Sequence, residues 1–175
     1  NVIVGEMPST WTSVDVTDQK LYSITDQTKD YVKGMTEDVT IYVVASEETC
    51  DTMVQETLKR YEDISDHIIV EYVDPTINPR FASQYTDENL YTNSLIVVSD
   101  KRSKVISYED LYESTIDYTT YESSITGYDA EGQITSALDY VTSDDMPKMY
   151  MTEGHGEVGL TSAYESGIAK QNVDY

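Results

Sequence analysis

Residues 39–73, VTIYVVASEETCDTMVQETLKRYEDISDHIIVEYV, decide the fold that the sequence predicts. They begin and end with short β-branched stretches, 39–44 and 68–73, of the kind that forms buried strands. Between the strands, apolar or half-polar residues recur at helical spacing on one face: Cys50, Met53, Val54, Thr57, Leu58 and Tyr61. The acids of Ser46-Glu47-Glu48 suit the positive end of such a helix. Two strands joined through a helix are expected to be parallel, with a right-handed crossover.

Weaker patterns extend this unit in both directions. Upstream, Ser23 or Thr25 can cap a short helix, and Gly34 can end it in a left-handed conformation. Downstream, the sequence predicts a short helix within 79–85, a hairpin of strands 94–98 and 104–108, a helix at 133–142 and a strand at 148–152. Residues 109–131 favour neither helix nor strand. The order over 39–141 is β-α-β-α-β-β-α, which predicts an α/β fold with a thioredoxin-like mixed sheet flanked by helices.

The chain divides into three segments. Residues 1–20 are rich in Thr, Ser and Asp and are expected to form an extended lead-in, and residues 21–146 to form the thioredoxin-like domain. Residues 147–175 are expected to begin a second α/β domain, because the strand at 148–152 is apolar on both faces, as central parallel strands are. Such a strand, cut off from its neighbours, would pair with another copy of the chain or with the first domain's sheet.

The charge of the chain limits its partners. Thirty-three acidic residues against eleven basic ones give a formal net charge of −22. Nucleic acids and anionic lipid headgroups are bound through clusters of Lys and Arg, so the composition excludes nucleic acid as a partner. The acidity also raises a calcium hypothesis, but the chain has no D-x-D-x-D-G loop, and we interpret the acids as a solvated surface.

A thioredoxin-like order raises a redox hypothesis that the residues do not support. Redox members carry a C-x-x-C at the start of the first helix, whereas this chain has a single cysteine, Cys50. Neighbouring acids are expected to raise the pKa of its thiol. We therefore interpret Cys50 as a buried structural thiol on the apolar face of the helix. The proline that precedes the third strand in this fold is replaced by Asn93-Ser94.

The stretch Glu153-Gly154-His155-Gly156-Glu157 is the most site-like of the sequence. Two glycines allow a tight turn that would expose His155 between the carboxylates of Glu153 and Glu157. Metal binding or acid–base chemistry is one hypothesis, although no third ligand is identifiable. The alternative is a binding or structural turn in which His155 donates to a backbone carbonyl.

A second distinctive stretch is Asp74-Pro75-Thr76-Ile77-Asn78-Pro79. The prolines fix the backbone, and Asp74 and Asn78 can each cap a turn, so a structural corner with a binding role is expected. The chain has no G-x-x-x-x-G-K-[ST] phosphate loop and no G-x-S-x-G elbow, so the sequence supports neither an ATPase nor a serine hydrolase.

Four stretches in order carry a resemblance to a family: Asp15-Val16-Thr17 with Leu21-Tyr22-Ser23-Ile24-Thr25, Val73-Asp74-Pro75 with Asn78-Pro79, Glu131 with Ile134-Thr135-Ser136-Ala137-Leu138, and Met149 to Glu157. Together they resemble the auxiliary components of uncharacterised ABC transport systems, the group that includes the gliding-motility protein GldG. The resemblance spans nearly the whole chain and departs from the family pattern around 109–130.

The resemblance implies a non-catalytic accessory or scaffolding role without a cofactor. Its partners would be the ABC permease and ATPase subunits of the same system, and the chain would face the extracytoplasmic side of the cell membrane. The chain has no apolar run long enough to cross a bilayer, so membrane helices would lie outside residues 1–175. The second domain would be amidotransferase-like and lack a nucleophilic cysteine. The alternative function is a hydrolase or metal site centred on the Gly154-His155-Gly156-Glu157 turn.

Overall fold

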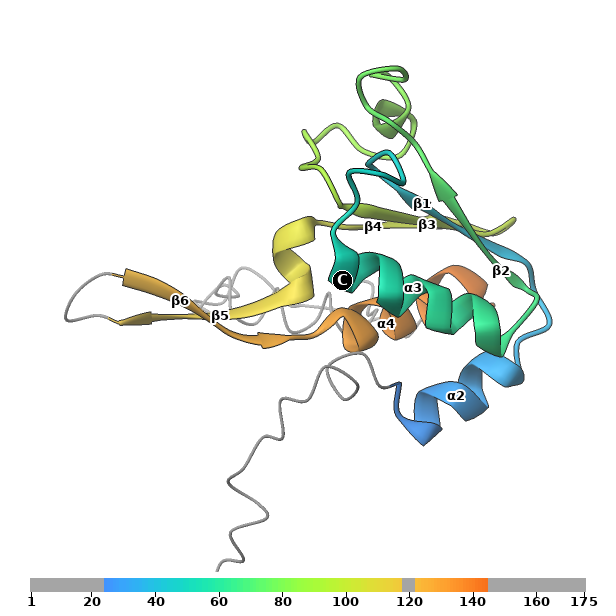
Figure 1. Ribbon diagram of the computed structural model, residues 1–175. Coiled ribbons are helices and arrows are strands. Elements are labelled where there is room, and N and C mark those ends of the chain that lie inside the picture. Colours follow the sequence, from blue (N-terminus) through green and yellow to red (C-terminus); the bar gives the residue numbers. More distant parts are fainter. Residues whose placement is uncertain (1–23, 118–121, 145–175) are drawn as a thin grey trace, which may run out of the picture.

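A computed structural model describes residues 24–117 and 122–144 of the 175-residue chain. Its elements, in order, are α2 (Asp26–Lys33), β1 (Val39–Val43), α3 (Thr52–Ile64), β2 (Ile68–Tyr72), the 3₁₀ turn η2 (Ala82–Gln84), β3 (Leu95–Val98), β4 (Ser103–Ile106), the 3₁₀ turn η3 (Tyr108–Leu111), β5 (Tyr112–Asp117), β6 (Glu122–Tyr128) and α4 (Ala130–Thr142). The helices lie together below the four-stranded sheet in Figure 1. The predicted α/β fold, a mixed sheet flanked by helices, is confirmed.

The sheet has the strand order β2-β1-β3-β4. β1 lies parallel to β2, with Val39 opposite Ile68, and antiparallel to β3, with Ile41 opposite Val97. β3 and β4 form an antiparallel hairpin with Ile96 opposite Val105. The parallel first pair and the later hairpin are thus both confirmed.

The core lies between the helices and one face of the sheet. β1 alternates, so that Val39, Ile41 and Val43 are fully buried while Thr40 and Tyr42 point to the other face. The buried residues that meet β1 come from β3 (Leu95 and Val97), α3 (Val54, Leu58 and Tyr61) and α4 (Ile134, Ala137, Leu138 and Val141). The helical spacing in the sequence therefore marks the faces of α3 and α4 that are buried.

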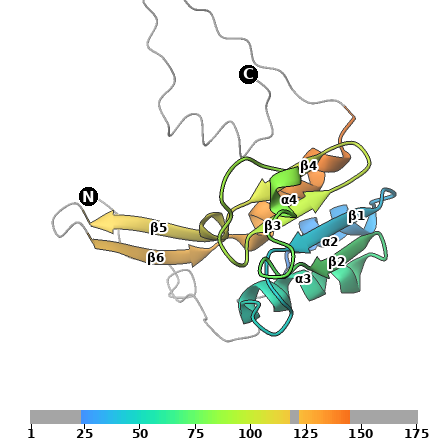
Figure 2. The ribbon, with the colours of Figure 1, turned by 90° about the horizontal axis from the view of Figure 1, so that it is seen from above.

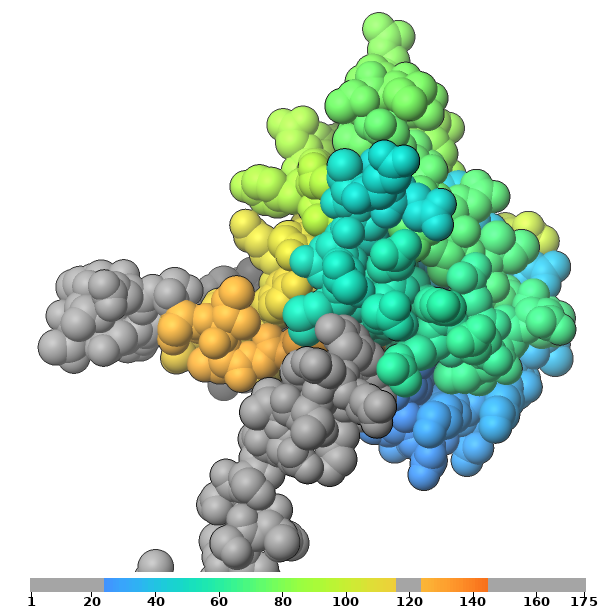
Figure 3. Space-filling view, in the orientation of Figure 1, coloured from blue at the N-terminus to red at the C-terminus, as the bar shows by residue number. Residues whose placement is uncertain are grey.

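A loop, not a long helix, partly covers the opposite face of the sheet. The ring of Tyr42 packs edge-on against Phe81, with centroids 4.8 Å apart, and lies 6.3 Å from the ring of Tyr85. Phe81 and Tyr85 flank η2, which falls within the short helix expected at 79–85. These three rings fasten the loop between β2 and β3 to the sheet. In Figure 3 this loop forms the prominence at the top of the molecule.

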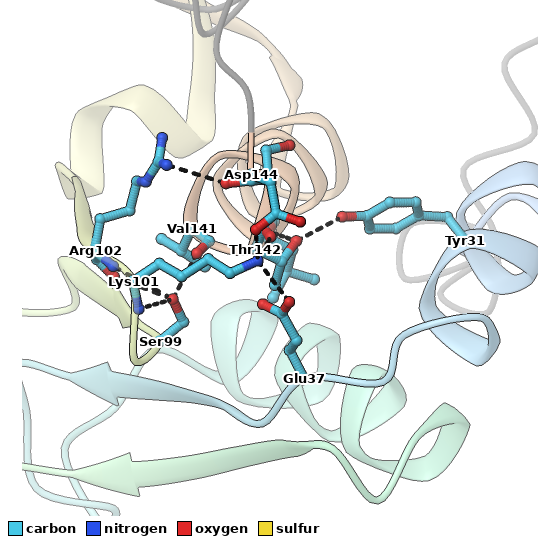
Figure 4. A network of polar contacts seen from close by, with 10 residues as sticks. Tyr31, Glu37, Ser99, Lys101, Arg102, Val141, Thr142 and Asp144 are labelled. Atoms are coloured by element: carbon cyan, nitrogen blue, oxygen red, sulfur yellow. Dashed lines mark hydrogen bonds and ion pairs between the residues drawn. The ribbon is translucent and has the colours of Figure 1, made fainter.

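Lys101, in the turn between β3 and β4, binds the carboxyl end of α4 (Figure 4). Its Nζ donates to the carbonyl of Thr142 at 2.6 Å and forms ion pairs with Glu37 at 2.6 Å and Asp144 at 2.7 Å. The last carbonyls of a helix lack partners within the helix and carry partial negative charge. Lys101 satisfies one of these carbonyls and joins α4 to the segment before β1.

Other residues of the same turn hold the neighbouring carbonyls of α4. Ser99 Oγ donates to the carbonyl of Val141 at 2.5 Å, and Arg102 Nη2 donates to that of Ser143 at 3.0 Å. On the far side of α4, the hydroxyl of Tyr31 lies 3.4 Å from Thr142 Oγ1. We call Ser99, Lys101 and Arg102 the α4 clamp.

Strands β5 and β6 form a second, two-stranded sheet that extends away from the body (Figures 1 and 2). Tyr112 pairs with Tyr128 at its root, and Ser114 pairs with Ile125 further out. The register shifts between Glu113 and Ser114, which marks a bulge. We call β5 and β6 the ribbon. It occupies most of the 109–131 segment, for which the sequence favoured no element.

Two local predictions are wrong. Gly34 follows α2 but has φ −81°, and its N–H bonds to the carbonyls of Asp30 and Tyr31. The next N–H, of Met35, bonds to Val32 at 3.2 Å, so the helix ends by tightening into a right-handed turn and needs no left-handed residue. Cys50 lies before α3, because the helix is capped by Asp51 and begins at Thr52.

Candidate functional site at the start of α3

The start of α3 corresponds to the position at which thioredoxin-like redox proteins carry their reactive thiol. Here Asp51 occupies it: Oδ1 accepts from the backbone N–H groups of Met53 at 2.8 Å and Val54 at 3.2 Å. Oδ2 accepts from the hydroxyl of Tyr108 at 3.1 Å. Both carboxylate oxygens therefore have partners, and the positive end of the helix is neutralised by the chain's own anion.

Asn93 connects this helix start to the sheet. Its Oδ1 accepts from the backbone N–H of Asp51 at 2.9 Å, and its own N–H bonds to the carbonyl of Val44 at 3.0 Å. Asn93 has φ 71°, the one positive φ at a non-glycine residue in the described ranges, and asparagine tolerates this conformation. Where thioredoxin-like proteins have a proline, this chain therefore has an asparagine in a left-handed conformation, and its side chain fixes the start of the helix.

Three tyrosines continue the network from Asp51 towards the ribbon. The rings of Tyr108 and Tyr112 meet at 5.3 Å and those of Tyr112 and Tyr128 at 5.2 Å. The hydroxyls of Tyr108 and Tyr112 lie 3.3 Å apart, and the Tyr128 hydroxyl lies 3.2 Å from Thr57 Oγ1 on α3. Burial, followed by the hydrogen bond with Tyr108, raises the pKa of Tyr112. The root of the ribbon is thus fixed to α3 by hydrogen-bonded, packed rings.

The thiol of Cys50 is half-buried against the core beside this network. Burial, and secondarily the charge of Asp51, raises its pKa from 9.0 to about 11. The direction expected from the sequence is confirmed. Its partly buried position is also consistent with a structural thiol. Cys50 packs against the core from the segment before α3, however, and not from the face of the helix. At neutral pH Cys50 is a protonated thiol.

We expect Cys50 to react slowly with iodoacetamide in the native protein. A pKa of about 11 instead of 9.0 leaves about one hundredth of the thiolate at pH 8. The alkylation rate should rise about tenfold per pH unit from pH 7 to 10 and increase sharply in denaturing urea. Rapid native alkylation that is independent of pH would contradict the raised pKa.

The predicted corner at 74–79 brings Asp74 and Asn78 together in one turn. Asp74 Oδ1 accepts from the N–H of Thr76 at 2.7 Å and from its hydroxyl at 2.6 Å, and the side-chain bond is the first cause of the lowered pKa of Asp74. The carbonyl of Asp74 accepts from the N–H of Asn78 at 2.9 Å. Between them Ile77 is 73% exposed. The Asp74 carboxylate therefore builds the corner, and the side chain that the corner presents is Ile77.

Two of the sequence stretches that carry the family resemblance meet in space. Glu131 Oε1 accepts from the backbone N–H of Thr25 at 2.9 Å and from its hydroxyl at 2.6 Å, next to the start of α2. The backbone carbonyl of Glu131 accepts from the buried hydroxyl of Tyr61, which also lies 2.8 Å from Thr135 Oγ1. Glu131 thus joins α2, α3 and α4.

The other sequence-predicted site residues, Glu153, His155 and Glu157, lie outside the described residues, as does the rest of the 147–175 segment. Among residues 24–117 and 122–144, no group of three or more His, Cys, Asp and Glu residues is arranged to hold a metal ion. In the same ranges no helix is both long and apolar enough to cross a membrane.

Sequence reasoning missed Asn93 and Tyr108 as parts of the site. In the sequence, Asn93 stands out only as a replacement for a proline. The residue that its side chain binds, Asp51, lies 42 positions away. Tyr108 lies 57 positions from its carboxylate partner. The many tyrosines that follow Tyr108 indicate an aromatic cluster in this region. A single sequence does not show which of these rings contact one another.

A protein family described as a domain of unknown function (DUF7088) matches residues 18–112, more than half of the chain. The match covers α2, the four-stranded sheet, α3 and η3. No curated protein and no solved structure matches the chain.

Proposed function

The chain belongs to the family of the domain of unknown function DUF7088, and within it we propose the role of a non-catalytic accessory or scaffolding domain of an ABC transport system. The observation that carries this proposal is the closed start of α3. A reactive thiol or a substrate anion would need the N–H groups that Asp51 already binds. The thiol next to it, Cys50, has a raised pKa.

The surface of the domain supports a role in binding other proteins. Ile77 is 73% exposed on the corner, and Ile125 is 70% exposed on the ribbon. Both stand on segments that extend beyond the body (Figure 3). We propose these two side chains as points of contact with partner proteins.

The transport assignment rests on the resemblance to GldG-type auxiliary components. In that family the domain faces the extracytoplasmic side of the membrane and accompanies a permease and an ATPase, with membrane helices that would lie outside residues 1–175. Two of the resembling stretches are joined by the Thr25–Glu131 bonds, so they belong to one folded unit. The net charge of −22 disfavours nucleic acid as an alternative partner.

Co-purification tests this function. The tagged full-length chain is expressed with the genes that flank it, and membranes are solubilised in mild detergent. We expect the permease and the ATPase to co-purify with the tagged chain, and protease added outside intact cells to cleave the domain. A wild-type preparation that contains neither subunit, or a domain that is protected until the cells are lysed, would overturn the proposal.

Matched variants indicate where the contact is made. Ile77→Asp is expected to reduce the recovered permease by about tenfold, because it places a charge on the presented side chain. Ile69→Asp is the control, since Ile69 is 48% exposed on β2, away from the corner. Both variants should retain the thermal transition of the wild type.

A further inference from the structure

The ribbon is a sheet of only two strands, and two-stranded hairpins are marginally stable in water unless something packs against them. Within the described residues neither outer edge of the ribbon pairs with another strand. Figure 2 shows it extending away from the four-stranded sheet. The open edges are a template for strand addition.

The root of the ribbon sets its direction. Tyr112 and Tyr128 pack together there, and the N–H of Asp129 bonds to the carbonyl of Leu111 at 2.9 Å. Beyond the bulge at Glu113, the side chains whose burial is described are exposed: Ser114, Thr115, Ser124, Ile125 and Thr126. A packed root and an exposed outer part suit the ribbon to binding another chain.

The charge of this region selects the partner. From residue 105 to 147 the sequence contains no lysine or arginine, whereas Glu109, Asp110, Glu113 and Asp129 surround the root. Edges that avoid pairing usually carry lysine or proline, and the ribbon has neither. A second copy would bring acidic ribbons together on a molecule of net charge −22, which opposes self-pairing. The complementary partner is positively charged.

From these observations we infer that the ribbon binds an extended, lysine- or arginine-rich segment of a partner protein, which adds as a strand along one ribbon edge. Backbone hydrogen bonds would supply the register, and the acids at the root would supply the charge selectivity. This inference rests on the proposed accessory function and names the surface that performs it.

The test uses hydrogen exchange of the isotope-labelled chain, followed by NMR. The probe is a capped heptapeptide of alternating lysine with threonine or valine, and its control has glutamate in place of lysine. We expect the lysine peptide to slow exchange of amides within 113–117 and 122–127 by about tenfold or more, with little effect elsewhere. The glutamate peptide should have no effect, and 0.5 M NaCl should weaken the protection.

Two variants make the result specific to the ribbon. In the first, Asn-Gly replaces residues 115–124, because Ser114 and Ile125 face each other in register and a two-residue turn can join them. In the second, Ser114→Lys and Ile125→Lys make the ribbon positive without shortening it. In both variants the lysine peptide should no longer slow amide exchange in the ribbon. The second variant provides the test if the first does not fold.

Three results would overturn the inference: equal protection over the whole surface, protection that rises with protein concentration without peptide, or protection by anionic vesicles and not by the peptide. They would indicate general charge attraction, self-pairing and membrane binding, respectively. The transporter subunits take no part in this experiment. A negative result with the peptide therefore leaves the co-purification test of the proposed function unaffected. A negative co-purification result likewise leaves the peptide test unaffected.

Discussion

Replacing Tyr61 with alanine is expected to lower the free energy of unfolding by about 3–5 kcal/mol, the range for removing a large aromatic side chain from a core. Tyr61 is the largest fully buried side chain in the described part of the chain, and it lies where α3 faces α4. Its hydroxyl bonds to the carbonyl of Glu131 at 3.1 Å and to Thr135 Oγ1 at 2.8 Å. The substitution therefore leaves both a cavity and unpaired polar groups.

Urea denaturation followed by circular dichroism measures this effect, and two further variants separate its parts. Tyr61→Phe keeps most of the volume and removes only the hydroxyl, so about 1–2 kcal/mol is expected. Tyr91→Ala removes a tyrosine that is 63% exposed and should change stability by less than about 0.5 kcal/mol. Equal losses for Tyr61→Ala and Tyr91→Ala would show that α3 and α4 do not pack through Tyr61.

Replacing Asp51 with alanine is expected to destabilise the domain by about 1–3 kcal/mol, the sum of a lost N-cap and a lost hydrogen bond. The change removes the acceptor for Met53 and Val54 and leaves the Tyr108 hydroxyl without its carboxylate. Asp51→Asn keeps an oxygen in place and should lose less. Glu48→Ala, at an exposed acid before the helix, is the matched control and should be nearly neutral.

The Asp51 variant has a second readout in Cys50. Asp51 is the smaller of the two causes that raise the pKa of Cys50, and burial is the larger. In Asp51→Ala the pKa should therefore fall but stay above 9.0, which an alkylation–pH profile measures. A pKa at or below 9.0 would show that charge, and not burial, controls the thiol.

The sequence predicted β1, α3 and α4 well because each of them buries one face in the core. In β1 the alternation of Val39, Thr40 and Ile41 is imposed by a core on one face. The helical spacing of Val54, Leu58 and Tyr61 reflects the same core. Such one-sided burial leaves a period in the sequence, and the period identified these elements.

The same reasoning failed where no core imposes a period. The outer ribbon exposes both faces, so Ser114, Thr115 and Ser124 show no alternation to read. Cys50 matched the helical spacing of α3, but the spacing does not show where the helix begins, and the N-cap Asp51 places its start after Cys50. The site itself depends on Asn93 and Tyr108, whose partner is distant in sequence.

The α4 clamp also determines how the domain would carry mechanical load. The chain continues to residue 175, so tension applied beyond Asp144 enters at the end of α4. There Lys101 holds both the Asp144 carboxylate and the Thr142 carbonyl, and Arg102 holds the carbonyl of Ser143. Tension would pass through these side chains to the β3–β4 turn, whose strands pair with each other and with β1. The last turn of α4 is thereby protected from being peeled off first.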